Sequence, residues 1–261
     1  MRLREDVAAP SRLALVRHEG SGSSALDVAV AVALLARVSG GELPSTLRLY
    51  RPGPTVAFGR LDALRPGFDD AVRAARNHGF EPVLRGPGGQ AVAYHAESVV
   101  LDLVVADPDP ISGVQDRFAE LAEVLAGGLR SLGVDARTGA VAGEFCRGAH
   151  SVNAGGRTKL VGTAQRVVRG GYLFAASIVA ADPSPVRAVL TDVYDALGID
   201  WDPATAGAVA DSVPGLGPGD VEAAVAAAFA ERGAVVAAAV DPVTLALARE
   251  RAPRHALPAE A

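Results

Sequence analysis

The 261-residue sequence has one cysteine, one lysine and few aromatic side chains. One cysteine cannot close an internal disulfide, and the first residues show no basic start followed by an apolar segment, so we expect no secretion signal and a cytoplasmic location. Apolar runs such as residues 25–38 are interrupted by Asp27 and are too short for a membrane span. With a formal net charge of −5 and a single tryptophan, the chain lacks the basic stripe and stacking aromatics of nucleic-acid binders. We therefore expect neither membranes nor nucleic acids as partners.

The scarcity of lysine singles out one position. Of the 25 lysine and arginine residues, all but Lys159 are arginine. Arginine cannot replace lysine where a site needs a compact ammonium group or a pKa that can move. Lys159 therefore indicates a functional requirement, with chance survival of a neutral lysine as the alternative.

Hydrophobic residues make up 49% of the chain, enough for one large domain with a real core. Apolar periodicity predicts helices at 24–38, 68–77, 111–132, 220–230 and 241–251. It predicts strands at 13–18, 46–51, 55–58, 82–85, 134–137, 151–153, 158–168 and 172–180, with 91–95 and 98–105 as a further, paired set. A Gly/Pro-rich joint at 213–219 divides a domain over residues 1–213 from a small helical tail over residues 214–261.

The segment Arg85–His95 reads RGPGGQAVAYH, a strand end followed by a glycine turn and a strand start. Glycines let backbone N–H groups approach a ligand closely, and Arg85 adds a positive charge for an anion or a polarised carbonyl. A purely structural hairpin turn would use the same glycines, and spacing alone favours that interpretation.

The second segment, 143–171, holds both rare residues. Cys146 is followed by Arg147 and, four positions after the cysteine, by His150, and the segment carries a local surplus of basic residues over Glu144. A nearby cation favours the thiolate, which is the form that attacks acyl groups. The alternatives are a buried structural thiol, an exposed strand charge at Lys159, and a histidine at position 150 without a catalytic role.

Together the two segments resemble the biotin/lipoate protein ligase superfamily, through RGPGGQAVAYH and GRTKLVGTAQR. Within it the chain is most similar to the octanoyl/lipoyl amidotransferases, through PTVAFGRLDALRPGFDDAV from Pro54, GEFCRGAHSV around Cys146 and KLVGTAQRVVRGG from Lys159. The resemblance extends from about residue 25 to residue 180. It departs from the family pattern at Pro87, at Arg147–Gly148 and at Ala149–His150.

The resemblance implies an α/β fold of the α+β type, with a mixed, largely antiparallel sheet flanked by helices. It also implies that residues 1–213 form an acyltransferase catalytic domain. Cys146 would attack the acyl group and form a thioester, and Lys159 would stabilise the oxyanion. The substrate would be bound by residues of the two motifs: Arg85, Gly86, Gly88, Gly89, Gln90, His95, Gly162, Thr163 and Gln165.

The partners implied are lipoyl-domain proteins, namely the glycine cleavage H protein and the E2 subunits of 2-oxoacid dehydrogenases, and an octanoyl or lipoyl group. No cofactor and no metal are expected. A first alternative is a lipoate–protein ligase, which would use ATP and Mg²⁺ to form an acyl-adenylate and would not need Cys146; residues 214–261 leave little room for the accessory domain common in such ligases. A second alternative is an acyl-binding protein without turnover. The transferase hypothesis requires Cys146 and Lys159 to meet around one substrate carbonyl.

Overall fold

The computed structural model describes residues 12–258. Its strands are β1 (Arg12–Glu19), β2 (Thr46–Arg51), β3 (Thr55–Phe58), β4 (Glu81–Leu84), β5 (Val92–Tyr94), β6 (Ser98–Ala106), β7 (Ala136–Thr138), β8 (Val152–Ala154), β9 (Thr158–Val168), β10 (Gly171–Val179) and β11 (Ala234–Ala238). Its α-helices are α1 (Ser24–Ser39), α2 (Phe68–Asn77), α3 (Val114–Ser131), α4 (Ser184–Ala196), α5 (Val209–Ser212), α6 (Pro218–Ala230) and α7 (Pro242–Arg251). Among the described helices, none is both long and apolar enough to cross a bilayer.

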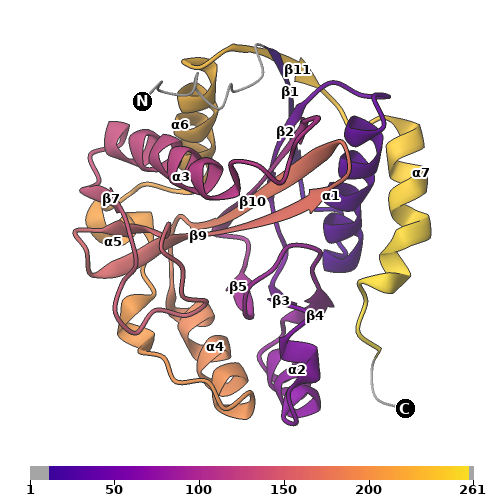
Figure 1. The fold of residues 1–261 in the computed structure, drawn as a ribbon. Helices are drawn as coiled ribbons and strands as arrows, with labels where there is room; N and C mark the ends of the chain where they lie inside the picture. The colour runs from indigo at the N-terminus through magenta and orange to yellow at the C-terminus, as the bar shows by residue number, and fades with distance from the viewer. Residues whose placement is uncertain (1–11, 259–261) are drawn as a thin grey trace.

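The strands form two sheets (Figure 1). The larger has eight strands in the order β11-β1-β2-β6-β10-β9-β8-β7, and the smaller has three in the order β4-β3-β5. In the large sheet only the β11–β1 and β1–β2 pairs are parallel, and the other pairs are antiparallel. The predicted mixed, largely antiparallel sheet flanked by helices is confirmed.

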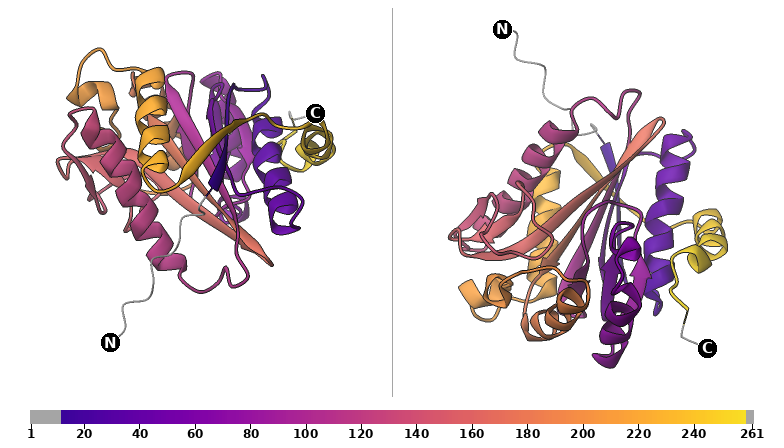
Figure 2. Two further views of the ribbon diagram at one scale, coloured as in Figure 1. Left: turned by 90° about the horizontal axis from the view of Figure 1, so that it is seen from above. Right: turned by 60° about the horizontal axis from the view of Figure 1, so that its bottom comes forward.

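Helices cover both faces of the large sheet, because its strands alternate apolar residues toward each face (Figure 2). On one face α3 and α6 pack on a core that includes Leu47, Leu101 and Phe174. On the other face α1 packs against Val104 and Leu173, and α7 lies outside α1. The smaller sheet, α2 and α4 share a second core around Phe58 and Val186. The candidate site lies where this second core meets the face that carries α1.

One predicted pairing is wrong. The runs at 91–95 and 98–105 are both extended, but β5 pairs with β3 in the small sheet, whereas β6 lies between β2 and β10 in the large one. A turn closed by the bond from Ser98 N to His95 O separates them. Alternation of apolar residues identifies a strand and its buried face, but the partner is chosen by contacts distant in sequence.

The segment after residue 213 is more than a helical tail. It contributes β11, which pairs with β1 at the edge of the large sheet, and α6, whose Val221, Val225 and Phe229 are buried in the main core. The helices expected near 220–230 and 241–251 are present as α6 and α7. The division at residue 213 stays a prediction, and residues 1–11 and 259–261 of the two proposed parts lie outside the described chain.

Candidate active site

Cys146 lies in the loop between β7 and β8, in a constrained backbone conformation. Its φ of 43° falls in the left-handed region, which is uncommon for a residue with a side chain. The Cys146 N–H donates to Tyr194 Oη at 2.7 Å, and Tyr194 Oη donates to the Ala91 carbonyl at 2.9 Å. Burial, followed by the nearby Cys146, raises the pKa of Tyr194 well above its ordinary value, so the phenol remains a donor. Tyr194, on α4, therefore ties the cysteine loop to the segment that follows the glycine turn.

Lys159, on β9, points under the same loop and is only 2% exposed. Its Nζ donates to the carbonyls of Phe145 and Cys146, each at 2.9 Å, and lies 3.4 Å from Glu144 Oε2. The two carbonyls accept hydrogen bonds from the ammonium group, and Glu144 adds an opposite charge through Oε2, which has no hydrogen-bond partner within the described chain. Burial lowers the pKa of Lys159, and the negative groups of Cys146 and Glu144 oppose that shift. In this structure Lys159 holds the Cys146 loop, and contact with a substrate oxygen requires it to exchange one of these acceptors.

Glu144 stabilises the Cys146 loop from its buried side. Its side chain is fully buried, and Oε1 accepts from Gly148 N and from Ser151 Oγ, both at 3.0 Å. Glu144 is the single acidic residue in the stretch 144–171, and this isolation is the feature of the sequence that could have identified it as a site residue. Sequence reasoning assigned it no role, because the hydrogen bonds that position it depend on how the loop closes.

The glycine turn meets the cysteine loop directly. Arg85 Nη2 donates to the Gln90 carbonyl at 2.8 Å and lies 3.8 Å from Cys146 Sγ. Gly89 has a φ of +98°, and a Cβ placed on it would lie 2.9 Å from Cys146 Sγ and 2.6 Å from Arg85 Nη2. Only glycine fits there. Arg85 Nε is buried and has no hydrogen-bond partner within the described chain.

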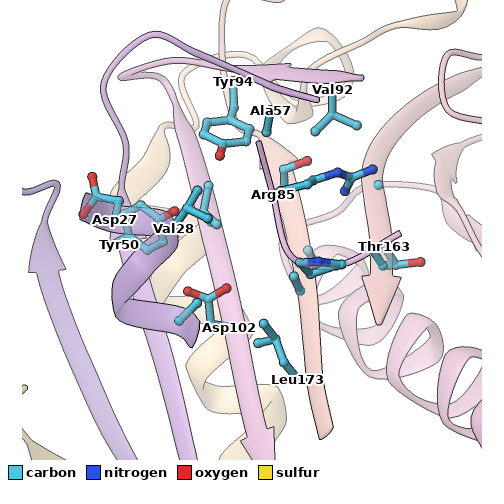
Figure 3. A pocket seen from close by; sticks show the side chains of 18 of the residues that line it. Asp27, Val28, Tyr50, Ala57, Arg85, Val92, Tyr94, Asp102, Thr163 and Leu173 are labelled. Carbon is cyan, nitrogen blue, oxygen red and sulfur yellow. The ribbon is translucent and has the colours of Figure 1, made fainter. Parts of the chain in front are cut away.

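Two cavities meet at Cys146. The inner cavity, of about 60 Å³, runs between α1, the sheet and the glycine turn (Figure 3), and its lining includes Val28, Tyr94, Arg85 and Leu173. The outer cavity, of about 310 Å³, is bordered by Gly88, Arg147, His150 and Lys159. Cys146, Thr163 and Ala164 line both. A chain held in the inner cavity can therefore present its end to a group that enters from the outer one.

Most of the predicted substrate-binding residues border one of these cavities: Arg85, Gly88, Gly89, Gly162, Thr163 and Gln165. Three do not. His95 is buried and its Nε2 lies 2.9 Å from the Asp182 carbonyl, Gly86 contributes its carbonyl to Arg166, and Gln90 contributes its carbonyl to Arg85. These three residues are not among those that line the two cavities, and their assignment to substrate binding stays a prediction. Across residues 12–258, no three His, Cys, Asp or Glu side chains gather into a possible metal site.

Comparison with known proteins identifies relatives of this chain. A family model described as the lipoyl protein ligase A/B catalytic domain matches residues 24–230. The octanoyl-[GcvH]:protein N-octanoyltransferase of Geobacillus kaustophilus is 27% identical over 166 residues, which are 64% of this chain and 58% of that protein. Octanoyltransferase LipM of Kyrpidia tusciae is 36% identical over 191 residues, which are 66% of this chain and 68% of that protein. The match thus spans little more than half of the first relative's length.

Solved structures agree on the fold. The crystal structure of lipoate-protein ligase A bound with ATP has a TM-score of 0.69 at 20% identity, covering 94% of both chains. The bipartite lipoate protein ligase of Thermoplasma acidophilum also has a TM-score of 0.69 at 20% identity, covering 94% of this chain and 92% of its own. Identity at this level shows a shared fold only. Since the family model covers most of the sequence and includes both cavities' lining, the chain belongs to the lipoyl protein ligase A/B catalytic domain family.

Proposed function

We propose that this protein is a cysteine-dependent octanoyl or lipoyl transferase, which moves an acyl group from a carrier protein to the lysine of a lipoyl domain through a thioester on Cys146. The observation that carries the proposal is the place of Cys146 on the shared wall of the two cavities. The relatives named as octanoyltransferases support the same acyl chemistry.

The exchange has two steps. The Cys146 thiol gives up its proton as its sulfur attacks the carbonyl carbon of the acyl-lysine amide, the C–N bond breaks, and the lysine amine takes up a proton as it leaves. The acceptor lysine then attacks the thioester as a neutral amine, the C–S bond breaks, and the proton lost by the attacking nitrogen returns to the sulfur. The inner cavity holds the acyl chain in both steps, and the carrier lysines use the outer cavity in turn.

The cations around the sulfur have different tasks. Arg85 Nη2 lies 3.8 Å from Sγ and places a positive charge beside the reacting sulfur. Lys159 holds the loop through two carbonyls and reaches the oxyanion by exchanging one of them. Removing one oxyanion donor costs about 10²–10³ in rate. No cofactor takes part.

The expected carriers are the glycine cleavage H protein and the E2 subunits of 2-oxoacid dehydrogenases. Arg147, exposed at the rim of the outer cavity, is suited to contact an acidic carrier surface. The Thermoplasma acidophilum ligase belongs to a lipoylation system with its own E2 lipoyl domain, which supports this class of partner.

The test is the intact mass of the wild-type protein and of Cys146→Ala after incubation with octanoyl-H protein, or octanoyl carrier protein, without ATP. We expect one octanoyl adduct on the wild type, released by hydroxylamine, and none on the variant. Absence of an adduct, together with acceptor acylation by both proteins when ATP and free lipoate are supplied, would instead identify a ligase.

A further inference from the structure

The floor of the inner cavity consists of two rows of residues that cross four strands. The first row is Gly162, Ser177, Val100 and Tyr50, on β9, β10, β6 and β2 in turn, and the second is Ala164, Ala175 and Asp102, on β9, β10 and β6. Arg48, opposite Asp102 on β2, is not among the lining residues. The rows begin beside Cys146 with small residues and end with charged and phenolic ones. Adjacent strands are about 4.8 Å apart, so Asp102 lies about 10 Å from Ala164, the reach of a medium-length acyl chain.

The far end of this floor is acidic. Arg48 is completely buried and donates to Asp102 Oδ2 at 2.8 Å, to Asp27 Oδ1 at 3.1 Å and to His18 Nε2 at 2.8 Å. Because His18 accepts a hydrogen bond there, its ring is neutral, in agreement with a pKa lowered by burial and by Arg48. One guanidinium therefore faces two buried carboxyl groups.

Asp27 and Asp102 differ in the hydrogen bonds that their carboxyl groups accept. Asp27 also accepts from Ser21 N, at 3.1 Å. Within residues 12–258 the hydrogen bonds to Asp102 come from Arg48 alone, through Oδ2, and both carboxylates line the cavity (Figure 3). Burial raises the pKa of Asp102, with Arg48 opposing and Asp27 adding to the shift. Asp102 Oδ1 thus faces the cavity without a hydrogen bond from the described chain, and a buried polar atom costs free energy unless a partner reaches it.

We infer that the inner cavity is built for an acyl chain that carries a hydrogen-bond donor, such as a hydroxyl group, at the end remote from its carbonyl. The donor binds Asp102 Oδ1, while the small residues of β9 and β10 accommodate the methylene chain. This inference rests on the proposed function, since it takes the carbonyl to lie beside Cys146. A chain that ends in a methyl group would leave Asp102 Oδ1 without a hydrogen-bond partner.

The first test is calorimetric titration of Cys146→Ala, in which no thioester can form. The ligands are the ω-hydroxy and the plain straight-chain acids of six, eight and ten carbons. We expect one hydroxy acid to bind about tenfold or more tightly than its plain partner. The inference is overturned if every plain acid binds as tightly as its hydroxy counterpart.

Variants then assign the preference to Asp102. In Cys146→Ala with Asp102→Leu, the advantage of the hydroxy acid should vanish, whereas Ser177→Ala, in the middle of the same floor, should retain it. If the leucine variant fails to fold, Asp102→Asn takes its place in the test. The asparagine keeps a hydrogen-bonding oxygen and should retain part of the preference. A preference that survives in a folded Asp102→Leu protein would contradict the inference.

The two proposals fail separately. A hydroxylamine-sensitive adduct from plain octanoyl carrier without any hydroxy-acid preference refutes the donor-ended chain and leaves the transferase intact. A clear hydroxy-acid preference without an adduct from any carrier refutes the transferase and leaves the preference for a donor-ended chain intact.

Discussion

At the scale of single residues, the neighbouring Gly88 and Gly89 in the turn after Arg85 differ in the space available for a side chain. Gly89→Ala would force a side chain into a φ of +98° and against Cys146 Sγ. We expect a backbone cost of about 1–2 kcal/mol. Because displacing reacting groups by about 1 Å commonly costs 10²-fold in rate, we expect thioester formation to slow by about that factor. Rapid-quench mass spectrometry measures the rate of thioester formation.

Gly88→Ala is the matched control. A Cβ on Gly88 would meet no atom within 4 Å, so stability should stay within about 0.5 kcal/mol of wild type and thioester formation should slow less than in Gly89→Ala. Equal losses at both positions would show that the turn tolerates no side chain at all, against the specific contact between Gly89 and the sulfur.

Glu144 offers a second residue-scale prediction. In Glu144→Gln the buried Lys159 ammonium loses its charged partner at 3.4 Å, while the amide oxygen can still accept from Gly148 N. Breaking a buried ion pair costs about 3 kcal/mol, which urea denaturation would detect, and the pKa of Lys159 should fall further. Ser151→Ala removes only a neutral hydrogen bond to the same carboxylate and should cost about 1 kcal/mol. A smaller loss in Glu144→Gln than in Ser151→Ala would contradict this role of the charge.

The sequence singled out Cys146 and Lys159 as the one residue of each type, in a glycine-rich context, and Arg85 as a basic residue before a glycine turn. It did not foresee Tyr194, which is 48 positions from Cys146 and has no local motif. His95, assigned to substrate binding by the resemblance, lies 2.9 Å from the Asp182 carbonyl and outside both cavity linings, and its assignment stays a prediction.

At the scale of elements, Asp241 links the start of α7 to Arg37 on α1. Asp241 caps α7 by accepting from Val243 N and Thr244 N, and it receives Arg37 Nη1 at 2.6 Å. Asp241→Ala should cost about 1–2 kcal/mol, mostly from the lost cap. Asp241→Asn keeps the cap and should cost less. Hydrogen exchange of the α7 amides should accelerate in the alanine variant, whereas unchanged exchange would contradict the role of the cap.

The same residue predicts a pH dependence. Hydrogen bonds from Thr244, followed by Arg37, hold the pKa of Asp241 at about 2, below its ordinary 3.8. Its contribution is therefore fully present above pH 3.8 and is lost as the pH falls toward 2. Thermal unfolding of wild type and Asp241→Asn across that window should converge at the acidic end. A constant difference would exclude the linkage.

Elements with strong local signals were predicted well. The long hairpin of β9 and β10 follows from alternation around Gly170, whose φ of +84° suits the turn. The assignment of β5 and β6 to different sheets, and the strand β11 within an apparently helical tail, depend on partners far along the chain. Short apolar runs such as β11 fit a helix or a strand equally well by periodicity.

At the scale of the whole molecule, the last part of the chain completes the core. A protein ending at residue 213 would lack α6 and with it the buried Val221, Val225 and Phe229. Their burial is worth about 5–9 kcal/mol, comparable with the total stability of a domain. We expect this truncation to show no cooperative thermal transition by circular dichroism. A cooperative transition would show that residues 214–258 are a separable tail.

A protein ending at residue 231 keeps α6 but loses β11 and α7. It should fold with a lower Tm, because β1 becomes an edge strand and the outer face of α1 loses its cover. Size-exclusion chromatography should detect association through the exposed edge. A monomer as stable as the full chain would contradict this expectation.

The sequence by itself determined the rare thiol and ammonium, the glycine turn, the family resemblance and most strand and helix positions, because these depend on residue type and on periods of two or 3.6 residues. Only the tertiary structure decided that Arg85 and Gly89 contact the sulfur, that Glu144 and Tyr194 hold its loop, and that Asp102 stands opposite Arg48 at the end of the inner cavity. These relations arise from strand order and cross-strand register. Contacts across the whole chain fix both, and no local pattern encodes them.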